Sequence, residues 1–389
     1  MSYIPIVKDS VVNNYDIDSE LVIVHASHIM WRPSVLPRLK EKFKVVIDIE
    51  TNRLVTADAK KSDSYKKLPY NIESSDFGKI FTNSTFRLQK LVEPVVQFQI
   101  DNDSEVIMVP YLMFTEWRSR TFTVNSELIA DTINHIGGRN DVNKPLYAVI
   151  NISNEALRSM ESVSYIKDRY LEFSDDLSGY IVIPDSFAER NGDPNNLLNL
   201  ARLVNGLKVA GKEVWVFPIG GFGQVLHALG AKNFGSGIFS KETSSVAMFD
   251  SDGEVYPRSD RWIYHPDIFV YVNAVALKKS GYKCDCLACS GDIAPNLSLK
   301  KQHDALVRVK AGKAMNSVPE SDKLEYVKQK IQNAITIVRD YDRQQFGPRS
   351  AYYLEKWLSV VDSALSWPKT VEEEDDLLNE LLVEIDSET

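Results

Sequence analysis

The six residues CDCLAC, from Cys284 to Cys289, contain all three cysteines of this 389-residue chain. A histidine follows fourteen residues after the last cysteine, in the segment LKKQHDALVRVKA, which we expect to be helical. Three thiolates and one imidazole make a tetrahedral ligand set that suits zinc. Because the protein would fill all four positions, such an ion has no open place for water and is structural. The predicted ligands are Cys284, Cys286, Cys289 and His303.

The composition is that of a globular protein with a full core. Hydrophobic residues make up 44% of the chain and charged residues 25%. The sequence has no apolar run of the roughly 18 residues that a membrane span needs. The first residues, MSYIPIVKDSVVNNYD, lack the basic flank and apolar centre of a signal peptide. We therefore expect a cytoplasmic protein, in a reducing compartment that disfavours a disulfide.

Short apolar runs alternate with helical patterns from about residue 20 to residue 275. The predicted strands are 21–25, 44–49, 105–109, 146–150, 179–183 and 213–217, and the predicted helices are 126–135, 155–170 and 195–210. The strands are rich in β-branched residues, as in a parallel sheet covered on both faces. An α/β barrel takes about 250 residues. The pattern predicts an α/β fold, a TIM-type (β/α)8 barrel with an inserted zinc-binding subdomain and C-terminal helices.

The chain is expected to divide into four segments. These are a barrel (1–275), a zinc-binding segment (276–315), C-terminal helices (316–370) and an acidic tail (371–389). Two helices, 321–341 and 350–365, carry apolar stripes with i, i+3, i+4 spacing. The polar stretch 56–69 is expected to be a long loop.

Charge is unevenly distributed along the chain. The net charge is −9, which argues against nonspecific attraction of the whole protein to nucleic acid. Basic residues nevertheless gather between residues 300 and 349. This cluster fits either a local nucleic-acid-binding face or a solvated helical surface.

The C-x-C-x-x-C pattern with a downstream histidine, placed after a run of βα units, resembles the zinc subdomain of tRNA-guanine transglycosylases. The resemblance covers roughly residues 20–310. It implies a TIM barrel, a homodimer, and exchange of guanine for a 7-deazaguanine base through an aspartate nucleophile. The spacing from the last cysteine to the histidine is shorter here than in the tRNA enzymes, and no tRNA-binding C-terminal domain is recognisable.

These departures make the chain more similar to divergent relatives of that family. They include DpdA-type DNA-modifying proteins and the transglycosylase-like proteins of type IV CBASS operons, which accompany QueC-like partners. The resemblance therefore implies recognition of a 7-deazaguanine-type base in an anti-phage defence or DNA-modification system. The implied partners are DNA, tRNA or a deazaguanine-modified protein, together with a QueC-like protein.

Active groups of a barrel lie at the carboxyl ends of its strands. The candidate catalytic residues there are Asp48 and Asp185, although an aspartate after a strand also serves as a cap. The turn PIGGFG resembles the glycine-containing turn of the transglycosylase base pocket, and glycine lets the backbone approach a purine closely. It also fits a tight turn without a ligand. The candidate base-binding residues are Tyr111, Asn151, Gly220 and Gly221.

The nucleophile is the point at which this chain departs from the family. Base exchange needs a carboxylate to attack the anomeric carbon of the sugar. The family's aspartate falls on Gly235, in the segment GAKNFGSG. Three alternatives follow: Asp48 or Asp185 is the nucleophile, a shifted alignment gives the role to Glu242 or Asp250, or the protein binds a deazaguanine without exchanging it. The sequence thus fits a transglycosylase-like enzyme, a non-catalytic binding module, or a barrel of unrelated chemistry with a coincidental zinc site.

Overall fold

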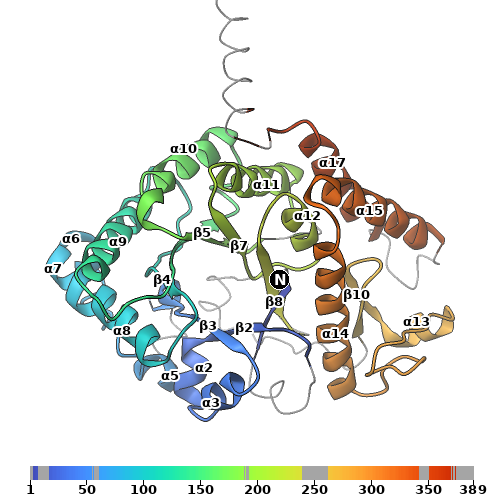
Figure 1. The fold of residues 1–389 in the computed structure, drawn as a ribbon, viewed down its shortest axis with the longest axis horizontal. Helices are drawn as coiled ribbons and strands as arrows, with labels where there is room; N and C mark the ends of the chain where they lie inside the picture. Colours follow the sequence, from blue (N-terminus) through green and yellow to red (C-terminus); the bar gives the residue numbers. More distant parts are fainter. Residues whose placement is uncertain are drawn as a thin grey trace, which may run out of the picture.

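The computed structural model describes residues 3–7, 17–54, 56, 61–187, 189, 192–238, 262–340, 350–368, 370 and 373. Eight parallel strands form a nearly closed barrel (Figure 1). They are β1 (Tyr3–Ile6), β2 (Leu21–His25), β3 (Lys44–Asp48), β4 (Ile107–Met108), β5 (Leu146–Ser153), β6 (Gly179–Asp185), β7 (Glu213–Val216) and β8 (Asn233–Gly237). Their order is β3-β2-β1-β8-β7-β6-β5-β4. The predicted TIM-type α/β fold is confirmed.

The barrel approaches closure between β3 and β4, the two ends of that strand order. The backbone N–H of Glu105 donates to the carbonyl oxygen of Val45 over 2.9 Å. The Ser104 hydroxyl oxygen accepts from the backbone N–H of Ile47 over 3.2 Å. The segment before β4 therefore continues the pairing that the short β4 does not make.

Helices surround the strands (Figure 1). They are α2 (Ala26–Trp31), α3 (Val35–Lys40), α5 (Asp63–Lys66), α6 (Lys79–Thr82), α7 (Ser84–Arg87), α8 (Glu93–Asp101), α9 (Arg120–Gly137), α10 (Met160–Leu171), α11 (Pro194–Val209) and α12 (Gly223–Ala228). Side-chain caps begin the longest of these: Ser119 precedes α9, Ser159 precedes α10 and Asp193 precedes α11. The α5 helix lies in the stretch expected to be a loop, so that expectation was wrong.

Two strands of the barrel were not predicted. β1 has only four residues, and β8 reads NFGSG, with two glycines that carry no strand signal. In the sheet Gly235 of β8 is the register partner of Ile4 in β1. A Cβ at Gly235 would lie within 3.0 Å of the Ile4 carbonyl oxygen. The two strands therefore pair closely because residue 235 has no side chain.

The C-terminal part follows residues that are not described. An antiparallel hairpin of β9 (Trp262–His265) and β10 (Val270–Asn273) leads to α13 (Ala274–Lys279), the cysteine segment and α14 (Leu297–Asn316). Helix α14 packs beside β1. The predicted C-terminal helices are α15 (Lys323–Asp340) and α17 (Ser350–Ala364), which pack against each other and against α12 and α11 respectively. In the part of the chain that is described, no helix is long and apolar enough to cross a membrane.

Candidate functional site

The four predicted metal ligands converge on one point. The ligand atoms of Cys284, Cys286, Cys289 and His303 all lie within 4.8 Å of one another. The three Sγ atoms lie 3.5, 3.3 and 3.3 Å from His303 Nδ1. A tetrahedral ion with Zn–S of about 2.3 Å and Zn–N of about 2.0 to 2.1 Å separates sulfur from nitrogen by roughly 3.5 Å. The residues therefore fit a metal ion such as zinc.

The backbone of the cysteine segment folds back on itself. The Cys286 carbonyl oxygen accepts from the N–H groups of Cys289 and Ser290, both over 2.9 Å. Ser290 and Gly291 have φ angles of 52° and 90°, and the Gly291 N–H closes the loop onto the Cys284 carbonyl over 3.0 Å. These turns bring the three sulfur atoms to one side.

The histidine reaches the thiols from α14. Its Nε2–H donates to the Tyr264 carbonyl oxygen of β9 over 2.7 Å, which fixes the tautomer and leaves Nδ1 as the ligand atom. The next residue, Asp304, accepts from Arg308 Nε and from the Tyr271 hydroxyl, each over 2.6 Å. An ion held here would join hairpin, loop and helix. With four protein ligands it would stabilise structure and leave no site for a substrate.

A second polar group lies at the carboxyl ends of β2 and β3. His25 and Asp48 are register partners, and His25 Nδ1 lies 3.0 Å from Asp48 Oδ2. The Tyr111 hydroxyl donates to Asp48 Oδ1 over 2.7 Å, and the backbone N–H of Glu50 donates to the same oxygen over 3.1 Å. The structure thus brings together two of the predicted residues, Asp48 and Tyr111. It adds His25, to which the same rule about strand ends applies.

A buried ion pair adjoins this group. Arg53 Nη1 lies 2.5 Å from Glu50 Oε1, and the Tyr65 hydroxyl donates to the same oxygen over 2.8 Å. The other oxygen of Glu50 accepts from the Ser27 N–H over 3.0 Å, at the start of α2. Glu50 itself has a φ of 51°. None of these residues was predicted from the sequence, because an ion pair across a turn leaves no periodic signal.

The charges in the group have defined states. Burial opposes ionisation of Asp48, but the hydrogen bond and charge of His25, with Arg53 and Tyr111, outweigh it and lower its pKa to about 2. Burial also opposes ionisation of Glu50, yet the charges of His25 and Arg53 lower its pKa. Burial and the neighbouring Asp48 raise the pKa of Tyr111 well above its usual value. At neutral pH two carboxylates therefore face one guanidinium and a neutral phenol.

The predicted Asn151 lies on β5 and connects to the same region. Its Nδ2 donates to the Ile183 carbonyl oxygen of β6, and its Oδ1 accepts from Asn52 Nδ2, each over 2.9 Å. Asp185, the second predicted catalytic carboxylate, ends β6 and accepts from the Ser186 hydroxyl over 2.8 Å. Across the near-closure of the barrel, β5 and β4 separate β6 from β3.

The glycine turn after β7 is occupied by a side chain of the protein itself. The Glu189 carboxylate accepts from the N–H of Gly220 and, over 3.0 Å, from the N–H of Phe222. Trp357 of α17 donates from Nε1 to the Glu189 carbonyl oxygen over 3.1 Å. A Cβ at Gly221 would lie 2.6 Å from Phe269 Cβ and 2.8 Å from the Trp357 ring. The Gly220 N–H thus already donates a hydrogen bond to Glu189. Residue 221 is a glycine because Phe269 and Trp357 leave no room for a side chain.

Most of the basic cluster on α14 and α15 is paired with acids. Lys323 lies 2.6 Å from Glu320, Lys328 lies 2.8 Å from Asp362, and Arg339 lies 3.1 Å from Glu355. Lys313 pairs with Asp18, and the buried Arg308 with Asp304. These contacts reduce the local positive charge on which the hypothesis of a nucleic-acid-binding face depended. Glu242 and Asp250, the alternative nucleophiles, lie outside the described residues.

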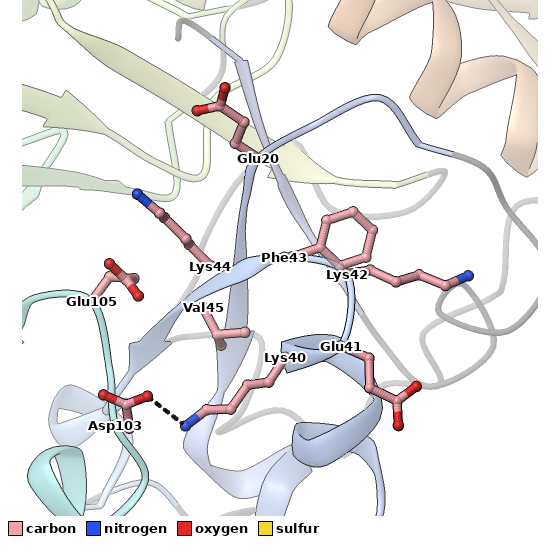
Figure 2. A pocket seen from close by; sticks show the side chains of 9 residues that line it. All are labelled: Glu20, Lys40, Glu41, Lys42, Phe43, Lys44, Val45, Asp103 and Glu105. Carbon is pink, nitrogen blue, oxygen red and sulfur yellow. Dashed lines mark hydrogen bonds and ion pairs between the residues drawn. The ribbon is translucent and has the colours of Figure 1, made fainter.

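A cleft of about 650 Å³ lies at the opposite end of the barrel, by the amino ends of β2 and β3 (Figure 2). Its lining alternates in charge: Lys40 lies 3.3 Å from Asp103, with Lys44 and Glu105 nearby (Figure 2). Because barrel enzymes act at the carboxyl ends of their strands, this cleft is not the candidate active site.

A scan against protein-family models gives no match for this chain. A search of curated proteins gives no match either. The identification therefore stands at the level of a TIM-like barrel with a Cys3His cluster that could hold a metal ion such as zinc.

Proposed function

We propose that the carboxyl end of this barrel binds a 7-deazaguanine-type base without exchanging it, as a transglycosylase-like recognition protein. The observation that carries the proposal is the His25–Asp48–Tyr111 group. An ionised Asp48 can only accept hydrogen bonds, so His25 donates to it from Nδ1, and Nε2 is the ring nitrogen that would contact a ligand. The His25 side chain is 16% exposed. A guanine-type base carries both an N–H donor and a carbonyl acceptor, so it can hydrogen-bond to Nε2 of a neutral or a charged ring.

Two features favour recognition over exchange. Exchange by double displacement needs a carboxylate free to attack carbon. Strand β8 has Gly235 at the position that the resemblance assigns to the nucleophile, with no space for a side chain. Both oxygens of Asp48 already accept hydrogen bonds, and a carboxylate with a pKa of about 2 is a weak base and nucleophile.

The charge distribution favours a modified partner protein as the carrier of the base. The ion pairs on α14 and α15 leave less positive charge for phosphate contacts. A partner of the QueC-like type in a CBASS-type operon fits this proposal. The alternative carriers are DNA and tRNA. Affinity that falls steeply as salt concentration rises would favour these nucleic acids, because phosphate contacts release counterions.

Calorimetric titration tests base recognition. Wild type should bind 7-deazaguanine more tightly than adenine. The His25→Ala and Asp48→Asn variants should bind it roughly 5- to 150-fold more weakly, the range that corresponds to about 1 to 3 kcal/mol for a lost buried hydrogen bond. The matched control is Asp103→Asn, which makes the same change at the other end of the barrel and should bind like wild type. Equal affinity in all four proteins would refute the proposed site.

Incorporation of labelled guanine into tRNA and DNA tests the absence of exchange. The expected result is the same background for wild type, Asp48→Ala and Asp185→Ala. Incorporation by wild type that either variant abolishes would show that the protein is an enzyme.

A further inference from the structure

A buried amide oxygen beside the candidate site has no hydrogen-bond partner. Asn52 lies in the short 3-10 helix Thr51–Arg53, directly after β3, and is 3% exposed. Its Oδ1 is enclosed and makes no hydrogen bond. An unsatisfied buried acceptor costs about 1 to 3 kcal/mol, so its presence calls for an explanation.

The orientation of this amide is fixed by its neighbours. The Ile183 backbone carbonyl can only accept, so Asn151 must point its Nδ2 toward it. The Oδ1 of Asn151 then faces Asn52, which must donate from its own Nδ2. Turning either amide around would place two acceptors 2.9 Å apart. These two hydrogen bonds therefore leave Asn52 Oδ1 as an acceptor without a partner. Only a donor from outside the two amides can satisfy it.

We propose that Asn52 determines ligand specificity by accepting a hydrogen bond from a ring N–H or an amino group of the bound base. This inference rests on the proposed function. Asn52 Oδ1 is an acceptor at the same end of the barrel as His25, so the site selects a flat heterocycle that carries a donor. The lactam N–H and the exocyclic amine of a guanine-type base are such donors. A site built to receive a donor rejects an analogue that lacks it, because its own polar group then stays unpaired.

Matched heterocycles separate this inference from the function that it rests on. The probes are 7-deazaguanine, guanine, 2-aminoquinazolin-4-one and benzimidazole, each with its N-methylated counterpart, and binding is measured by ligand-detected NMR. Wild type should prefer the N–H forms by about tenfold. Asn52→Leu should bind N–H and N-methyl forms equally, whereas Asn102→Leu, at the C-cap of α8, should keep the preference. Asn52→Ala gives the same comparison should Asn52→Leu fail to fold.

Each outcome decides one of the two proposals. If 7-deazaguanine does not bind but other N–H heterocycles bind in an Asn52-dependent way, the proposed function fails and the role of Asn52 stands. If 7-deazaguanine binds equally to wild type and the Asn52 variants, the function stands and the role of Asn52 is refuted. A wild-type protein that binds no probe, or shows no N–H preference, also overturns the inference.

Discussion

Replacing Gly235 by alanine should destabilise this protein, even though alanine has the smallest side chain. The new Cβ would lie within 3.0 Å of the Ile4 carbonyl oxygen, whereas ordinary contact begins at 3.4 Å. The clashing oxygen belongs to the backbone of β1, and β1 is paired with β2 on its other side. Neither β1 nor β8 can therefore shift freely to relieve the clash. Extra atoms in a packed interior cost about 1 to 3 kcal/mol. Alanine also restricts the unfolded chain more than glycine does, which restores about 0.4 to 1 kcal/mol of stability.

The net expectation is a loss of roughly 1 to 2 kcal/mol. An unfolding entropy of about 2.1 cal/mol/K per residue gives roughly 0.8 kcal/mol per degree for 389 residues, so Tm should fall by about 2 °C. Gly235→Asp should fall further, because it also buries an unpaired carboxylate. The matched control is Gly137→Ala at the end of α9, where nothing lies within 4 Å. It should raise stability by up to about 1 kcal/mol.

Scanning fluorimetry of the four proteins gives the comparison. If Gly235→Ala melts at or above the wild-type temperature, the packing argument is wrong. A folded Gly235→Asp that exchanges labelled guanine would show that β8 can accommodate the nucleophile after all.

Three further predictions concern the metal cluster, the Asp48 carboxylate and the glycine turn. Purified protein should contain about one zinc ion per chain by elemental analysis; Cys286→Ser should lose it and melt earlier, whereas the neighbouring Ser290→Ala should keep it. The lowered pKa of Asp48, about 2 against 3.8, contributes roughly 2 kcal/mol above pH 4 that disappears as pH falls toward 2; the unfolding free energy should therefore fall less over this range in Asp48→Asn, which keeps only the contribution of Glu50, than in wild type. Glu189→Gln should destabilise the turn by about 1 to 3 kcal/mol, because the two N–H groups bond to different carboxylate oxygens and the NH2 of glutamine would face one of them as a second donor; hydrogen exchange at Gly220 and Phe222 should become faster.

The barrel could be predicted where strands are long and apolar. Strands β2, β3, β5, β6 and β7 agree with the sequence pattern within a few residues at their ends. Every residue of β5 and β6 is buried, which explains their continuous apolar runs. β1 and β8 escaped prediction for local reasons: one is four residues long, and the other contains glycines required by the close approach of its neighbour.

The two candidate sites differ in how much the sequence reveals. Three metal ligands lie within six residues and the fourth on the next predicted helix, so their types and spacing were enough. The group around Asp48 draws its partners from β2, from the turn after β3 and from the segment after β4. Asp48 and Tyr111 could be predicted as site residues because each lies at the carboxyl end of a predicted strand. The partners Glu50 and Arg53 depend on side-chain directions within an irregular turn, which sequence periodicity does not encode.

The segment from Asp48 to Arg53 contradicts ordinary folding preferences in three independent ways. Two carboxylates and a guanidinium are buried there, although buried charges are expensive even when paired. Glu50 has a left-handed backbone, a conformation that costs about 1 to 3 kcal/mol in residues other than glycine. Asn52 keeps an acceptor oxygen unpaired. Such departures are expected at functional sites, where the fold tolerates them for the sake of a ligand. Strand β8 needs no functional explanation, because its close packing against β1 fully explains the glycine at position 235. The two observations together favour a barrel that retains a binding site after β3 and has no exchange nucleophile on β8.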